Sequence, residues 1–168
     1  VNSDYVRGSE LREDDIKAMK ALIEEVSEDE MMAFTSLVID AYASPEGEIS
    51  LNENLADDRA NSASKVVARE LKRNKIEVED SFYDLNGKGE DWAGFQEAMQ
   101  ESDIADKDLI LRILNMYNDV KKREEEIRNL AATYDEIAEK ILPDLRRSQM
   151  TLNYEITGKT DEEILSLA

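Results

Sequence analysis

Apolar residues along the chain recur with helical spacing in some stretches and alternate with polar residues in others. Residues 13–26 carry apolar side chains three and four positions apart, which is typical of an amphipathic helix with one buried face. Residues 35–43 are apolar and β-branched without a helical period, so they predict a strand that is covered on at least one face. Residues 149–156 alternate cleanly and predict a late strand.

The stretch after the strand at 35–43 is expected to turn and then form a helix. Pro45 and Gly47 break the strand pattern. Asn54 is a predicted helix cap, because its short side-chain oxygen accepts hydrogen bonds from the first helical N–H groups. The helix is predicted over 55–73, with one apolar stripe. We expect the protein to recognise its ligand at the mouth of this strand–loop–helix unit.

Residues 76–99 predict a further strand, a loop and a short helix. The strand is expected within 76–85. Two closely spaced glycines predict a loop at 86–89, because glycine disfavours both regular structures. The short helix is predicted over 91–99. One of its faces carries three residues that we expect in the core, namely Trp92, Phe95 and Met99.

Helical spacing dominates residues 108–142. The apolar stripe lapses at the charged run 121–126, which is either the solvated end of a helical hairpin or an exposed stretch of one long helix. A hairpin or kinked pair is the preferred interpretation. Pro143 is expected to end this region, because its ring cannot continue helical hydrogen bonding.

Two terminal segments add weaker patterns. Val1–Gly8 is a candidate first strand, and Thr160–Glu163 has the T-x-x-E pattern of a capping box that opens a final helix. Because Val1 is not an initiator and the last residues end within a helical pattern, we expect the chain to be a piece of a longer protein.

Composition and charge narrow the classes of function. In 168 residues, 40 acidic side chains oppose 21 basic ones, for a net charge of −19. Such a surface repels phosphate backbones and anionic headgroups, so nucleic acid and membrane surfaces are poor partners. No stretch reaches the apolar length of a membrane span. The sequence has no histidine and no cysteine, which removes nearly all zinc sites and the Ser-His-Asp and Cys-His arrangements. We therefore expect no enzyme, no metal and no cofactor.

Two carboxylate arrangements are the remaining chemical alternatives. Glu46, Glu90 and Asp91 lie on expected loops, and paired carboxylates can hydrolyse glycosides, but no spacing singles these three out. Residues 84–91 alternate oxygen-bearing side chains around a glycine, yet they lack the full twelve-residue calcium loop with its terminal glutamate.

Residues 41–60 resemble the signature of the OmpA-like domain, the periplasmic C-terminal domain of outer-membrane protein A. That signature runs G-H-T-D-x-x-G and then Y-N-x-x-L-S-x-R-R-A, and residues 41–44 stand where it has G-H-T-D. Residues 87–90 resemble the family's G-x-G-E, and residues 145–148 its D-R-R-V before the last strand. The resemblance covers about residues 1–90 and 143–158. The matching residues of the first signature are Gly47, Asn52, Leu55, Arg59 and Ala60.

The element order and this resemblance together give the expected fold. The order β-α-β-α-β, helices, β predicts an α+β domain with a mixed four-stranded sheet and helices mainly on one face. The OmpA-like domain is expected over 1–158. Within it, 91–142 is longer than the single helix usual in the family and is a candidate helical insertion. Residues 159–168 are expected to begin a following helical segment.

The resemblance implies a non-catalytic periplasmic domain that tethers an outer-membrane-associated protein to peptidoglycan. In the family, an aspartate and an arginine grip the diaminopimelate of the stem peptide, which presents a carboxylate and an ammonium on one carbon. By motif position the arginine is Arg59, near the start of the predicted helix, where N–H groups also favour an anion. Ser44 takes the aspartate's place without its charge. Glu46 would supply a carboxylate only if the loop folds back. The candidate peptidoglycan-binding residues are Arg59, Ser44, Ala43, Glu46, Asn52 and Arg147.

The alternative is a protein-interaction or scaffold module that keeps the OmpA-like fold with a degenerate site. The insertion, with its helix at Trp92, would then contact an envelope protein. Wall binding predicts an open pocket beside Arg59, whereas the scaffold interpretation predicts that a neighbouring carboxylate engages Arg59. Asn52 is expected to fix the loop, and Arg147 is alternatively a structural ion-pair partner beside the sheet.

Overall fold

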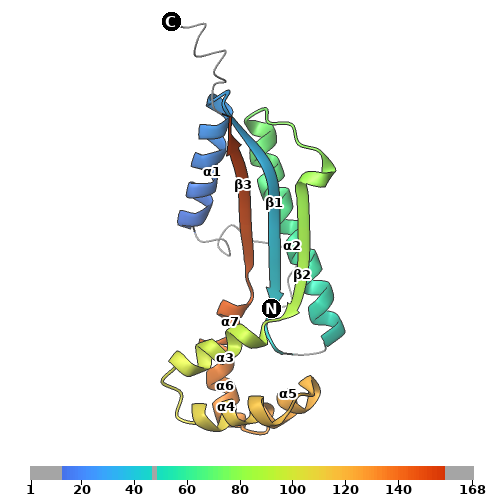
Figure 1. Cartoon of the computed structure of the whole chain (residues 1–168). Helices are drawn as coiled ribbons and strands as arrows, with labels where there is room; N and C mark the ends of the chain where they lie inside the picture. Colours follow the sequence, from blue (N-terminus) through green and yellow to red (C-terminus); the bar gives the residue numbers. More distant parts are fainter. Residues whose placement is uncertain (1–12, 47–48, 158–168) are drawn as a thin grey trace, which may run out of the picture.

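The computed structural model describes residues 13–46 and 49–157, and there it shows a three-stranded mixed sheet with helices (Figure 1). The strands are β1 (Met32–Ala43), β2 (Tyr83–Glu90) and β3 (Ser148–Ile156), in the order β2-β1-β3. Strand β1 runs parallel to β2 and antiparallel to β3. The predicted α+β class and mixed sheet are confirmed, with three strands described and not four. Val1–Gly8 and Thr160–Glu163 lie outside the described residues.

Helices α1 (Glu13–Glu28) and α2 (Ile49–Arg73) cover one face of this sheet. Alternate residues of β1 point into the core between them, with Leu37 and Ile39 fully buried. Small side chains of α2, such as Ala60 and Ala63, let the helix approach the strands closely. The predictions of a helix at 13–26 and of strands at 35–43 and 149–156 are confirmed. The first and last follow from the period of their apolar residues, and 35–43 from its apolar, β-branched composition.

The start of α2 differs from the prediction. The helix begins at Ile49, so Asn54 lies inside it and not at its cap. The extra turn projects past the end of the sheet, where the Asn52 amide makes two tertiary hydrogen bonds. Capping preference is a local signal, and here tertiary contacts outweigh it.

The loop predicted at 86–89 is wrong, because these residues belong to β2, which follows a short 3-10 turn η1 (Asp80–Phe82). Helix α2 packs so close to β2 that the strand has no room for a side chain at Gly87. A Cβ atom at Gly87 would lie 2.8 Å from the backbone nitrogen of Asp57. Gly89 has a φ of 66°, which glycine adopts without strain. The glycines therefore permit close helix–strand packing and do not break the strand.

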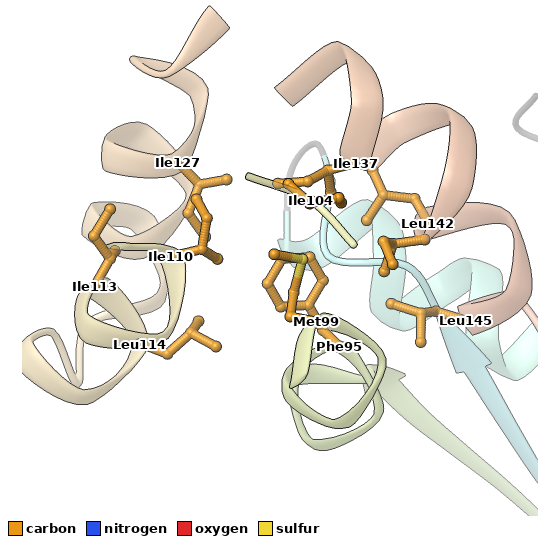
Figure 2. Close-up of a cluster of buried hydrophobic side chains, with 11 residues drawn as sticks. Phe95, Met99, Ile104, Ile110, Ile113, Leu114, Ile127, Ile137, Leu142 and Leu145 are labelled. Atoms are coloured by element: carbon orange, nitrogen blue, oxygen red, sulfur yellow. The ribbon is translucent and has the colours of Figure 1, made fainter. Parts of the chain in front are cut away.

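Residues 92–145, named here the helical unit, form a second core at the end of the sheet where β1 and β2 finish (Figure 1). The predicted helix at 91–99 is confirmed as α3 (Trp92–Glu101). In place of a hairpin or kinked pair, the rest forms α4 (Lys107–Met116), α5 (Val120–Arg128), α6 (Ala131–Lys140) and α7 (Leu142–Leu145). Figure 2 shows their apolar side chains converging around Phe95 and Met99.

Pro143 does not simply end this region. It occupies the first turn of α7, where a missing N–H costs nothing, directly after α6 ends at Lys140. The charged run 121–126 lies within α5. Among the described residues, no helix combines the length and apolar character that crossing a membrane requires.

Candidate functional site

All six candidate residues lie around one end of the sheet, where β1 ends, α2 begins and β3 starts. We call this region, where the sheet end meets the helical unit, the junction (Figure 1). Backbone hydrogen bonds join the segments that meet at the junction. The Asp91 N–H donates to the Ala43 carbonyl at 3.0 Å, and the Tyr42 N–H donates to the Arg147 carbonyl at 2.9 Å. Ala43 itself is buried and offers no side-chain chemistry.

The loop after β1 folds back, which is the condition under which Glu46 was expected to supply a carboxylate. The Glu46 N–H donates to the Ser44 carbonyl at 2.8 Å. The Ser44 hydroxyl donates to Glu46 Oε1 at 3.0 Å. Arg146 completes the cluster, since its Nε donates to Ser44 Oγ at 3.0 Å and its Nη2 pairs with Glu46 Oε1. A carboxylate therefore stands beside Ser44, with an arginine bound to it.

Arg59 is withdrawn from solvent, with 8% of its surface exposed. Among its contacts, Nη1 donates to the Tyr42 carbonyl at 2.6 Å. Since α2 begins at Ile49, Arg59 lies more than two turns into the helix. The expectation that N–H groups of the first turn assist Arg59 in binding an anion is therefore wrong, because those groups belong to residues near Ile49.

Asn52 holds the loop to the strand next to it. Its amide nitrogen donates to the Glu46 carbonyl and to Glu90 Oε1, each at 2.7 Å. The other oxygen of Glu90 accepts a hydrogen bond from the Trp92 indole at 2.8 Å. A continuous set of hydrogen bonds thus runs from the loop through β2 to the first residue of the helical unit.

Arg147 is a structural partner beside the sheet in this structure. Its guanidinium pairs with Asp91 and lies 4.5 Å above the centre of the Tyr42 ring, within cation–π range. Asp91 is 6% exposed and also caps α3 by accepting from the Gly94 N–H at 3.0 Å. One buried carboxylate therefore starts the helical unit and fastens it to β3 through Arg147.

A small pocket lies between the loop and the helical unit. It has room for about one water molecule. Pro45 forms one wall, and the rest come from the helical unit, where the Trp92 and Phe95 rings meet edge to face at 5.6 Å. The remaining lining residues are Glu124, Ile127, Arg128, Tyr134, Ile137 and Leu142.

Sequence reasoning missed Arg146 and the role of Pro45. Arg146 was visible as the first arginine of the Arg146–Arg147 pair, but its partners lie about a hundred positions away in sequence. Pro45 carried only a turn signal, and nothing local indicates that it lines a pocket together with aromatic side chains of the helical unit.

The chemical alternatives find little support in the geometry. Residues 84–90 form a strand, whose alternate side chains point to opposite faces and so do not converge on a calcium ion. No group of three or more acidic side chains in the described part of the chain is arranged to hold a metal ion. Glu46, Glu90 and Asp91 each accept from an arginine, an amide or an indole of the protein itself.

Comparison with known proteins adds no assignment. No family model matches the chain, and no curated protein matches it. The OmpA-like resemblance therefore stays a prediction from its motifs.

Proposed function

We propose that the chain is a non-catalytic periplasmic module that attaches a larger envelope protein to peptidoglycan, by recognising the diaminopimelate of the stem peptide. The observation that carries the proposal is the fold-back of the loop after β1. It places the Glu46 carboxylate against the Ser44 hydroxyl, the position where the resemblance calls for a negative charge. Asn52 and Arg59 lie at the same end of the sheet and contact the same segment.

The chemistry of this cluster suits a ligand that carries both charges on one carbon. The Glu46 carboxylate is the natural partner for the ligand's ammonium. The Arg59 guanidinium is the natural partner for its carboxylate, because charge-assisted hydrogen bonds of this kind are the strong ones. Both Glu46 and Arg146 are partly exposed, with 32% and 26% of their side-chain surfaces open to solvent.

The second candidate is a protein-interaction or scaffold module whose former site is now structural. It is favoured by burial, since Ser44 is only 3% exposed and Arg59 8%. Ser44 and Arg59 make hydrogen bonds to groups of the protein itself. In this view the junction holds the helical unit on the sheet, and the unit carries the surface that meets an envelope protein.

A titration separates the two candidates. The domain is titrated with a diaminopimelate-containing muropeptide while backbone amide shifts are followed, alongside Glu46→Gln and the matched control Glu136→Gln. Each variant loses one carboxylate from an ion pair, but Glu136 pairs with Lys140 within α6, at 2.7 Å. Wall recognition predicts saturable shifts in residues 42–59 that Glu46→Gln abolishes and Glu136→Gln preserves. If no backbone amide shifts at millimolar muropeptide, wall recognition is excluded and the protein-interaction module is the candidate that stands.

A further inference from the structure

The three residues Ser44, Pro45 and Glu46, named here the strap, are held from two sides. Arg146, which directly follows α7, binds both the hydroxyl of Ser44 and the carboxylate of Glu46. Between these two, Pro45 is buried and forms a wall of the pocket that the helical unit otherwise lines. The helical unit therefore holds the strap by packing, and Arg146, directly after the unit, holds it by charge.

A second set of contacts connects the strap to the pocket. Asn52 binds the Glu46 carbonyl and Glu90, and Glu90 in turn accepts from Trp92. Trp92 and Pro45 line the same pocket. Movement of the strap away from Arg146 therefore changes the surroundings of Trp92, which is the one tryptophan of the sequence.

A residue just before the strap binds Arg59. Arg59 donates to the carbonyl of Tyr42, two residues before Ser44, and is almost fully buried there. The pair between Arg146 and Glu46 is partly exposed to solvent on both sides. Partly exposed ion pairs are individually weak, so this contact can break while the two apolar cores stay intact.

We propose that the strap is an autoinhibitory latch on the stem-peptide site. In the closed state Arg146 neutralises the Glu46 carboxylate, and Arg59 and Ser44 are withdrawn from solvent. Release of the Arg146 contact frees the carboxylate for a ligand ammonium and uncovers the Arg59 guanidinium for a ligand carboxylate. This latch rests on the proposed wall-binding function, whose site it regulates, and it assigns to the helical unit and the adjacent Arg146 the task of holding that site closed.

The first test measures opening without any ligand. Arg146→Gln removes the grip on Glu46, and Arg73→Gln is its matched control, since Arg73 loses a comparable ion pair with Glu70 at the far end of α2. Two readouts are followed in proteins shown to be folded by circular dichroism: phenylglyoxal modification of Arg59 by peptide mass spectrometry, and acrylamide quenching of Trp92. The latch predicts several-fold faster modification and stronger quenching in Arg146→Gln alone. Pro45→Ala, which keeps both charges, is expected to act in the same direction.

The second test adds the muropeptide to the same proteins. Apparent affinity scales with the fraction of binding-competent molecules, so Arg146→Gln is expected to bind on the order of tenfold tighter than wild type. Equal binding by wild type and Arg146→Gln would overturn the latch and uphold the wall-binding function. Opening of the strap without any binding would overturn the wall-binding function and the inhibitory role with it. If Arg146→Gln and Pro45→Ala are folded and neither increases Arg59 modification or Trp92 quenching, the latch is overturned while the wall-binding function is unaffected.

Discussion

Gly87 illustrates how a single missing side chain positions the elements around the site. It lies in β2 where α2 passes over the strand, and a Cβ atom there would lie 2.8 Å from the Asp57 nitrogen. Because that atom is backbone, the contact cannot be relieved by a side-chain rotation. The close approach brings α2 against β2, and the same approach lets Asn52 reach Glu90. A residue without a side chain thereby contributes to the geometry of the junction.

We expect Gly87→Ala to destabilise the fold by about 1–3 kcal/mol, the cost typical of overpacking. Without the close approach, alanine in a strand would be neutral or would stabilise by up to about 1 kcal/mol through the unfolded state. Urea denaturation of Gly87→Ala beside Thr151→Ala, an exposed position of β3, measures the difference. A Gly87→Ala protein as stable as wild type would contradict the packing described here.

At the scale of elements, the junction depends on where helices begin. Helix α3 is capped by Asp91, whose carboxylate accepts from the Gly94 N–H and also pairs with Arg147. Helix α5 is capped in the same way by Asp119, which accepts from the Lys122 N–H at 3.0 Å but lies on the exposed surface. The two caps share one local chemistry and differ in their tertiary partner.

Removing each cap is expected to reduce the free energy of unfolding by a different amount. Asp119→Ala should cost about 1 kcal/mol, the typical value of a lost N-cap. Asp91→Ala should cost about 2–4 kcal/mol, because it also removes a charged hydrogen bond from Arg147. The Arg147 side chain is 43% exposed, so solvent screening keeps the extra loss below that of a fully buried pair. Thermal unfolding of both variants measures the two losses, and equal losses would show that the Arg147 contact contributes nothing.

At the scale of the whole molecule, a chain with a strongly negative net charge folds around two apolar cores. One core lies between the sheet and α1 and α2, and the other lies within the helical unit. The net charge of −19 acts across both, because like charges repel in the compact state. The ion pairs at the junction offset this repulsion only locally.

Added salt is therefore expected to stabilise the protein. Raising sodium chloride to about 0.5 M shortens the screening length to a few ångströms and weakens the repulsion, while exposed ion pairs lose at most about 1 kcal/mol each. The unfolding midpoint should rise with salt in calorimetry. A variant with the exposed Glu25, Glu28 and Glu125 changed to lysine should have a higher unfolding midpoint at low salt. Its midpoint should also rise less than that of the wild type when salt is added. A midpoint that falls with salt would show that ion pairs outweigh the net charge.

The sequence alone determined the elements whose signal is local. The helix at 13–26, the strand at 149–156 and the short helix at 91–99 follow from the spacing of their apolar residues, and the strand at 35–43 follows from its apolar, β-branched composition. These signals lie within each segment and need no distant partner. The α+β class and the mixed sheet follow from the order of those elements.

Only the tertiary structure decided how the junction is built. Helix α2 begins at Ile49 because Asn52 finds partners in the loop and in β2. Arg146 engages Ser44 and Glu46 across about a hundred residues, a pairing that no local pattern encodes. The packing of the sheet against the helical unit specifies this contact, because only that packing brings Arg146 within hydrogen-bonding distance of the loop after β1.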